Sequence, residues 1–243
     1  MLSDHAWSRL LETDIVVAGV GGLGSQVAMH LARLAPVRFE LWDPAHVDEP
    51  DLNRQVLYDT ADLGKRKMDA AAERLSRINP EVTVRVVASE LDAVAFFERS
   101  VVGDPRSAGA GGGSAGAAGA AGALVFFDCL DSFTARRELA DVQERLAREG
   151  RACPVFHGGV ETWYGQVTTL LPGTGAYERP FGPQYDDGPA ARKPILPHVV
   201  SAVASFQVGE FIRWCETPEE TPLSNSLLLF DGREMHTRAV RLD

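Results

Sequence analysis

A glycine-rich turn near the start of the chain has the residue types and spacing that bind a phosphate. The segment GVGGLG carries glycines at positions 19, 21, 22 and 24 and follows the apolar run DIVVA. Glycine lets backbone N–H groups approach a phosphate at a helix N-terminus. Asp43 ends the next apolar run, where a carboxylate can accept hydrogen bonds from both ribose hydroxyls. Gly19, Gly21, Gly22, Gly24 and Asp43 therefore predict a nucleotide site, although a dinucleotide dehydrogenase fits them equally well.

Three charged residues further along the chain have the chemistry to act on a triphosphate. The guanidinium of Arg54 can hold two phosphate oxygens at once, and Lys67 supplies a mobile point charge. Asp131 follows another apolar run, at the strand end where such sheets bind ligands, so its carboxylate can hold Mg²⁺. When a carboxylate attacks the α-phosphate of ATP, positioned cations and a metal stabilise the growing negative charge. Structural alternatives remain: Arg54 and Lys67 could be solvated surface cations, and Asp131 could only cap the following helix.

The elements that must position these residues alternate between strand and helix. Buried strands are predicted over 14–19, 38–43, 83–89, 123–131, 153–161 and 164–173. Helices are predicted over 25–35, 65–79, 92–100, 133–150 and 195–215, followed by a hairpin about Asp231 and Gly232. This order predicts an α/β fold, a doubly wound, mostly parallel Rossmann-like sheet with helices on both faces and a C-terminal antiparallel extension.

One segment does not fit this pattern. Residues 103–123 are mostly Gly, Ala and Ser, with too little apolar bulk to build a core. We interpret them as a flexible surface loop inserted in the fold; an active-site lid is disfavoured because the segment has few side chains that could touch a ligand. The elements on both sides of the loop are needed for one sheet. We therefore predict a single domain over residues 1–243.

Composition excludes several classes of function. Lys and Arg number 24 against 34 Asp and Glu, a net charge of −10, which argues against a general nucleic-acid surface. No apolar run approaches a membrane span and no export signal is visible, so we predict a cytoplasmic protein without membrane contact. Cys129, Cys153 and Cys215 are far apart and form no CxxC pair, so neither disulfides nor a cysteine zinc site is expected.

The continuation of the glycine turn resembles the ThiF/MoeB/HesA family, the bacterial relatives of ubiquitin-activating enzymes. That family shows a GxGGLG turn, an acidic strand end, an N-L-x-R-Q segment, a G-x-x-K before a helix, an R-I-N-P helix end and a D-C-x-D-N turn. The counterparts here lie at 19–24, 43, 51–55, 64–67, 77–80 and 128–132. Several spaced motifs therefore occur here in the same order as in the family. The likeness covers the chain from residue 14 to about 235.

The resemblance implies a function and a set of site residues. It implies ATP-dependent adenylation of the C-terminal glycine of a small ubiquitin-fold sulfur carrier ending in Gly-Gly. The carrier would be similar to ThiS or MoaD and would serve thiamine or molybdenum/tungsten cofactor synthesis. A homodimer is also implied. The residues implied to bind ATP and Mg²⁺ are the four glycines, Asp43, Asp51, Arg54, Gln55, Lys67 and Asp131.

Several positions depart from the family pattern. The family commonly has a second acidic residue two places after Asp43, where Ala45 stands, and Asp51 and Ser132 each replace an asparagine. The two CxxC pairs of zinc-binding members are missing, so no zinc is predicted. Only thirteen residues precede the first predicted strand, and Arg9 is a poor candidate for the arginine that many members insert into a neighbouring subunit's site.

Two alternative functions follow from these observations. The departures leave open a degenerate, non-catalytic partner subunit of an activating enzyme. An NAD(P)-dependent oxidoreductase rests on the glycine turn alone and does not explain Arg54 or Lys67.

The resemblance also bears on where the reaction stops. Thioester-forming relatives place a cysteine in the loop before the crossover helix, and here that loop, DDGPAARKP at 186–194, has none. Cys129 is expected to be buried and inert, and His157 to be a packed residue rather than a catalyst. We predict adenylation without a thioester step, after which a separate sulfur donor takes over the carrier–AMP anhydride.

Overall fold

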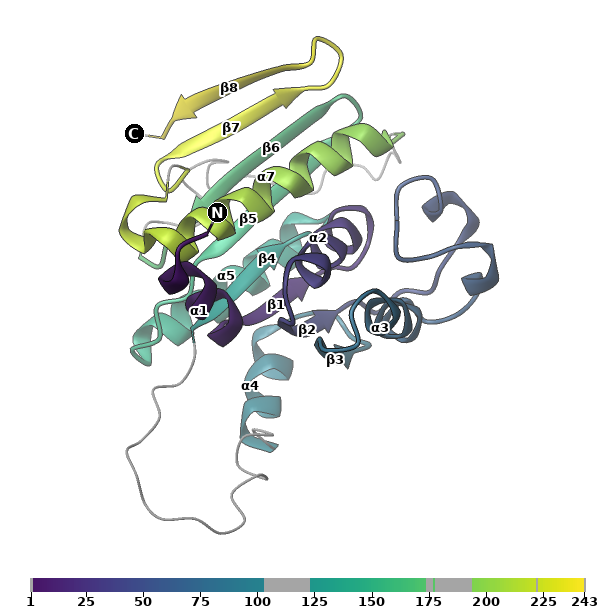
Figure 1. The fold of residues 1–243 in the computed structure, drawn as a ribbon, viewed down its shortest axis with the longest axis horizontal. Coiled ribbons are helices and arrows are strands. Elements are labelled where there is room, and N and C mark those ends of the chain that lie inside the picture. The colour runs from purple at the N-terminus through teal and green to yellow at the C-terminus, as the bar shows by residue number, and fades with distance from the viewer. Residues whose placement is uncertain (1, 103–122, 174–176, 178–193, 222, 243) are drawn as a thin grey trace.

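A computed structural model of the protein describes residues 2–102, 123–173, 177, 194–221 and 223–242. The loop predicted over 103–123 lies outside these residues except for Ala123, and the segment 186–194 lies outside them except for Pro194. The described elements form one sheet with helices packed along it (Figure 1).

The sheet has eight strands in the order β3-β2-β1-β4-β5-β6-β7-β8. The strands are β1 Asp14–Ala18, β2 Arg38–Trp42, β3 Thr83–Val87, β4 Leu124–Asp128, β5 Val155–Glu161, β6 Tyr164–Leu170, β7 Ser226–Asp231 and β8 His236–Arg241. The first five are parallel, and β6, β7 and β8 continue the sheet in antiparallel fashion. The predicted parallel sheet and antiparallel extension are confirmed, including the closing hairpin of β7 and β8.

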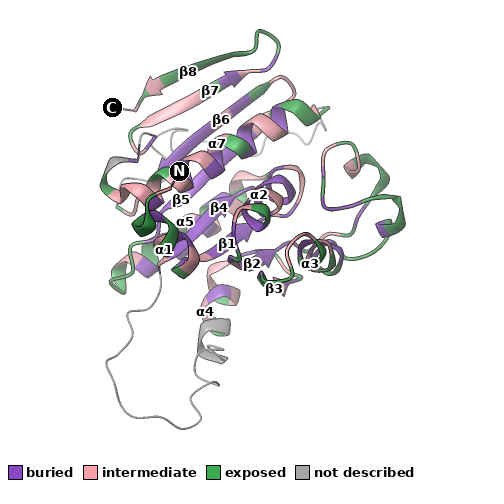
Figure 2. Cartoon of the chain, in the orientation of Figure 1, coloured by how far each residue is buried: buried purple, intermediate pink, exposed green. Residues whose placement is uncertain are grey.

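Helices cover both faces of the sheet, as predicted for a doubly wound fold. They are α1 Asp4–Glu12, α2 Gly22–Leu34, α3 Lys67–Ile78, α4 Ala93–Val102, α5 Phe133–Arg148 and α7 Pro197–Glu216. Side chains alternate across β1: Ile15 and Val17 join the core layer of α1, α2, α3 and α7, while Val16 and Ala18 join that of α4 and α5. Buried residues concentrate in the central strands, whereas β8 at the edge is largely exposed (Figure 2).

The sequence prediction was wrong in several details: α2 begins at Gly22 rather than residue 25, β6 ends at Leu170 rather than residue 173, and two further differences have a clear physical reason. The first is α1, which the sequence pattern did not predict: Ser3 caps it by accepting a hydrogen bond from the Ala6 N–H, and its apolar face packs on α7. The second is the end of β4, predicted at residue 131 but observed at Asp128. The strand ends there because the Leu130 N–H donates to the Asp128 carboxylate at 3.0 Å, which turns the chain.

The packing of α2 against β1 requires a glycine at position 24. A Cβ atom there would lie 1.9 Å from the carbonyl oxygen of Gly19, so Gly24→Ala should destabilise the fold by about 1–3 kcal/mol, as overpacking typically does. Gly209→Ala in the middle of α7 is the matched control, because its Cβ would meet nothing within 4 Å. It should stabilise the protein by about 0.5–1 kcal/mol. Urea unfolding measures both; equal stability of the two variants would contradict the proposed close approach.

Candidate active site

Three turns meet at the carboxyl edge of the parallel sheet. Ala18, the last residue of β1, is aligned with Trp42 of β2 and Asp128 of β4. The turns that follow these strands therefore start side by side, at Gly19, Asp43 and Cys129. This is also the point where the strand order reverses, between β1 and β4, which is where ligands bind in open α/β sheets.

The glycines of the first turn have two different roles. Gly19 has φ +83°, and a Cβ atom there would lie 2.8 Å from the carbonyl oxygen of Cys129, so this position admits only glycine. Gly21 and Gly22 instead face other side chains: a Cβ on Gly21 would lie 3.7 Å from Gln55 Nε2, and one on Gly22 would lie 3.6 Å from the Arg54 side chain. The turn thus contacts the 51–55 segment, which the family resemblance also assigned to the site.

Asp43 holds the glycine turn in place. Its carboxylate is 8% exposed and accepts hydrogen bonds from the Val20 N–H and the Ala45 N–H, each at 2.8 Å. Tyr58 donates its hydroxyl to the Val20 carbonyl at 2.8 Å, so both backbone groups of Val20 are fixed. Burial, with a further contribution from Asp43, raises the pKa of Tyr58 and keeps it a donor. Each carboxylate oxygen of Asp43 retains a second lone pair that can accept a ligand hydroxyl.

The two predicted cations lie on opposite sides of one carboxylate. Lys67 Nζ is 3.2 Å from Asp51 Oδ2, and Arg54 Nη2 is 3.4 Å from Asp51 Oδ1. The Lys67 side chain is only 9% exposed and that of Arg54 is 24% exposed, so the alternative of fully solvated surface cations is wrong for both. Lys67 also begins α3, and its backbone N–H donates to the Ala45 carbonyl at 2.9 Å, which connects this cluster to the turn after β2.

Gln55 presents a buried acceptor without a partner. The residue is 3% exposed, and among the described residues no donor reaches its Oε1. A buried polar atom left unpaired costs about 1–3 kcal/mol, so such atoms usually have a partner in the working protein. The Gln55 atom that faces Gly21 is the donor Nε2, so Gln55 can donate a hydrogen bond to a ligand in the glycine turn.

Asp131 is exposed in the turn between β4 and α5. The alternative that it caps α5 is wrong, because Ser132 is the cap and accepts a hydrogen bond from the Ala135 N–H at 3.1 Å. The structure does not join Asp131 to Asp51, Arg54 or Lys67 by any contact among the described residues. The turn that carries Asp131 is instead joined to the glycine turn, through the backbone contact of Gly19 with Cys129.

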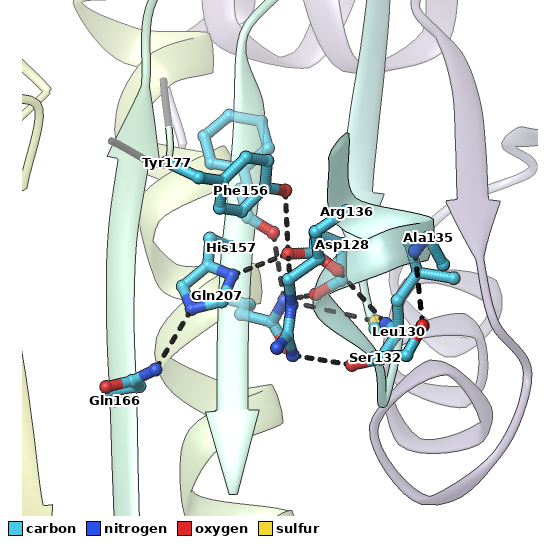
Figure 3. Close-up of polar contacts among 11 residues, drawn as sticks. Asp128, Leu130, Ser132, Ala135, Arg136, Phe156, His157, Gln166, Tyr177 and Gln207 are labelled. Atoms are coloured by element: carbon cyan, nitrogen blue, oxygen red, sulfur yellow. Dashed lines mark hydrogen bonds and ion pairs between the residues drawn. The ribbon is translucent and has the colours of Figure 1, made fainter. Parts of the chain in front are cut away.

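The sequence analysis missed a buried cluster beneath this turn. Asp128 is fully buried, and its Oδ2 lies 3.2 Å from Arg136 Nε, 2.5 Å from His157 Nδ1 and 2.7 Å from the Tyr177 hydroxyl (Figure 3). Burial alone would raise the pKa of Asp128, but the charge of Arg136 and the contact with His157 lower it to about 2. Burial lowers the pKa of His157, and the residue is fully buried, so the prediction that it is a packed residue is confirmed. No local sequence pattern joins these residues: Asp128 and His157 lie opposite each other only through the register of β4 with β5.

The three cysteines are all buried and free. Burial raises the pKa of Cys129 well above its usual range, that of Cys153 to about 11 and that of Cys215 to about 12. They are therefore thiols at neutral pH, and a thiol is a poor nucleophile. The burial of Cys129 confirms the prediction for that residue.

In the part of the chain that the structure describes, no group of three or more His, Cys, Asp or Glu side chains lies close enough together to hold a metal ion. A single carboxylate such as Asp131 is not in conflict with this, since Mg²⁺ is commonly held by one or two carboxylates together with substrate phosphates. None of the described helices combines the length and the apolar character that crossing a membrane requires.

Comparison with known proteins agrees with the fold and the motifs. A ThiF family model matches residues 2–243. The SAMP-activating enzyme E1 of Haloferax volcanii is 29% identical over 235 residues, covering 96% of this chain and 77% of that protein. The sulfur carrier protein ThiS adenylyltransferase of Escherichia coli K12 is 25% identical over 237 residues, covering 96% of this chain and 84% of that protein.

A solved structure supports the same fold. The crystal structure of E. coli MccB with AMPCPP and MccA superimposes with a TM-score of 0.73 at 17% identity, covering 98% of this chain and 66% of that one. The family resemblance seen in the motifs is thereby confirmed, and the chain belongs to the ThiF family.

Proposed function

We propose that this chain uses ATP and Mg²⁺ to adenylate the C-terminal glycine of a small ubiquitin-fold sulfur carrier. The observation that carries the proposal is the pair of part-buried cations, Arg54 and Lys67, held by Asp51 next to the glycine turn. The two relatives described above are named as an activating enzyme and as an adenylyltransferase of a sulfur carrier. Both names favour adenylation over the oxidoreductase alternative, which offers no role for the cations.

The reaction places its largest charge change on the phosphates. A carboxylate oxygen of the carrier's terminal glycine bonds to the α-phosphorus of ATP, and the bond from that phosphorus to pyrophosphate breaks. The products are a carrier acyl-adenylate and pyrophosphate. Negative charge grows on the phosphoryl oxygens and on the leaving group, so stabilisation by fixed cations is the main contribution that the protein can make.

Arg54 and Lys67 can serve the phosphates without leaving Asp51. An ammonium group has three N–H donors and a guanidinium five, and each uses only part of that capacity on Asp51 and, for Arg54, on the Pro50 carbonyl and the Asn53 side chain. We assign the triphosphate to Arg54, Lys67 and the backbone of Gly21 and Gly22. Binding a group of higher charge at part-buried cations is favourable because little solvent screens them.

The remaining site residues bind the rest of the nucleotide and the metal. We assign Asp43 to the ribose hydroxyls, Gln55 through its Nε2 to a ligand acceptor at the glycine turn, and Asp131 to Mg²⁺ bound through the phosphates. Gly19 and Gly24 belong to the same nucleotide turn and allow its close packing against β4 and α2.

Several finer features complete the proposal. The chain acts as a single adenylation domain and pairs with a second copy as a homodimer. It works in the cytoplasm without zinc and hands its acyl-adenylate to a separate sulfur donor. The buried, protonated thiols of Cys129, Cys153 and Cys215 support a reaction that stops at the adenylate.

Nucleotide choice separates adenylation from the oxidoreductase alternative. ATP with Mg²⁺ should raise the thermal unfolding temperature of the protein, and NAD⁺ or NADH at the same concentration should not, because a ligand that binds only the folded state stabilises it. Thermal melts with each nucleotide measure this. Equal or greater stabilisation by NAD⁺ would rule out our proposal.

The phosphate cations should be needed for catalysis rather than folding. Arg54→Ala and Lys67→Ala should each slow carrier-dependent ATP–pyrophosphate exchange by roughly 10²-fold, as does removal of one donor to developing charge. Arg77→Ala is the control on the same helix as Lys67, since that exposed side chain is paired with Glu73, away from Asp51. If both site variants exchange as fast as the control, the assignment is wrong. A wild type that exchanges with no ThiS- or MoaD-like carrier would favour the degenerate partner subunit.

The cysteines should be dispensable for adenylation. The triple variant Cys129→Ala, Cys153→Ala, Cys215→Ala should keep the exchange rate within a few-fold of wild type, apart from a loss of stability due to the cavities left in the core. Denaturing gels with and without reductant provide the second measurement. A carrier conjugate that survives denaturation, breaks on reduction and disappears in the variant would contradict adenylation without a thioester.

A further inference from the structure

The turn that presents Asp131 is fixed through both of its flanks. Leu130 donates its N–H to Asp128 Oδ1 at 3.0 Å, and its carbonyl accepts from Arg136 Nη2 at 2.5 Å, so both backbone groups of this residue are engaged (Figure 3). On the other side, Ser132 caps α5. Asp131 lies between these two residues, with its side chain exposed.

Asp128 and Arg136 act on this turn as a unit. Arg136 uses Nε for the Asp128 carboxylate and Nη2 for the Leu130 carbonyl, so one planar group sets the position of both. The carboxylate in turn is oriented by His157 and by the Tyr177 hydroxyl. The backbone of Asp128 is also held, because Gln207 of α7 donates to its carbonyl at 3.0 Å.

Stability alone gives no reason for charges at this place. Asp128 is fully buried and the Arg136 side chain is 7% exposed, and taking such a pair out of water costs about as much as their attraction returns. Apolar side chains of the same size would fill the space as well. Apolar side chains could not, however, hold the N–H and the carbonyl of Leu130, because those groups need an acceptor and a donor.

We propose that Asp128 and Arg136 are positioning residues of the adenylation site, which fix the 129–132 turn so that Asp131 meets the magnesium ion of the bound nucleotide. The inference rests on the proposed function, in which Asp131 binds Mg²⁺. Neither residue touches the nucleotide. His157 and Tyr177 support them by holding the carboxylate of Asp128.

The test is the magnesium dependence of Arg136→Lys, which keeps the charge but cannot bond Asp128 and Leu130 as a fork. The Mg²⁺ concentration for half-maximal ATP–pyrophosphate exchange should rise roughly 10-fold, because partners that orient a metal ligand commonly contribute 10- to 100-fold in metal affinity. The half-saturating carrier concentration should stay the same. Calorimetric titration of ATP at several Mg²⁺ concentrations, without carrier, should show the same shift.

The matched control is Gln143→Met on the same helix. Gln143 is 1% exposed and bonds the carbonyls of Cys153 and Leu170, so its loss weakens the packing of α5 without touching the turn. It should lower the unfolding temperature and leave the Mg²⁺ dependence at the wild-type value. If Arg136→Lys does not fold, Tyr177→Phe, which removes one donor to Asp128, should raise the half-saturating Mg²⁺ concentration a few-fold.

The outcomes separate this inference from the proposed function. If Arg136→Lys, or Tyr177→Phe in its place, has the Mg²⁺ dependence of Gln143→Met, the positioning role is wrong even though exchange proceeds. If wild type binds ATP with Mg²⁺ but exchanges with no carrier, the proposed function fails, and the calorimetric shift still decides the positioning role. A wild type that does not bind ATP with Mg²⁺ would overturn both.

Discussion

The contact between Gly19 and the end of β4 is the constraint on which the rest of the site depends. The two backbones approach so closely that a Cβ on Gly19 would lie 2.8 Å from the Cys129 carbonyl, and φ at Gly19 is +83°. Gly24 must then be a glycine as well, because α2 begins over the Gly19 carbonyl. With both glycines in place, the turn after β1 packs directly against the turn after β4. This contact, together with the pairing of β1 and β4, brings the nucleotide residues at one turn close to the turn that carries Asp131 at the other.

The site contains two clusters of charge that differ in how fully they are paired. Around Asp128, the carboxylate is paired with the side chains of Arg136, His157 and Tyr177, all of them buried. Around Asp51, Arg54 and Lys67 use only part of their N–H donor capacity among the described residues. A carboxylate paired on several sides fixes geometry, whereas cations with spare donors can accept a ligand. The difference in pairing thus assigns different roles to two groups of similar composition.

The sequence predicted what depends on local pattern and missed what depends on strand register. Apolar runs and the glycine turn identified the parallel strands and the edge at which the site forms, because their signals span only a few residues. Asp128 contacts side chains 8, 29 and 49 positions away in the chain, and no local pattern connects them. Likewise Asp131 and Ser132 are both good helix caps, so only the observed hydrogen bond to Ser132 Oγ shows which of them caps α5. The helix α1 was missed because its nine residues are fewer than the roughly 10–12 over which a helical pattern is normally recognised in a sequence.

Two departures from the family pattern, at positions 45 and 51, lie next to Lys67. The acidic residue common two places after Asp43 is replaced here by Ala45, which still supplies its N–H to Asp43 and its carbonyl to the Lys67 N–H. The asparagine common at the start of the 51–55 segment is replaced by Asp51, whose carboxylate lies 3.2 Å from Lys67 Nζ. The backbone contacts at position 45 are thus made without an acidic side chain, and the Lys67 ammonium still has a carboxylate partner in Asp51. The charge pairing of Lys67 is therefore intact despite both replacements, which favours a working adenylation site over a degenerate partner subunit.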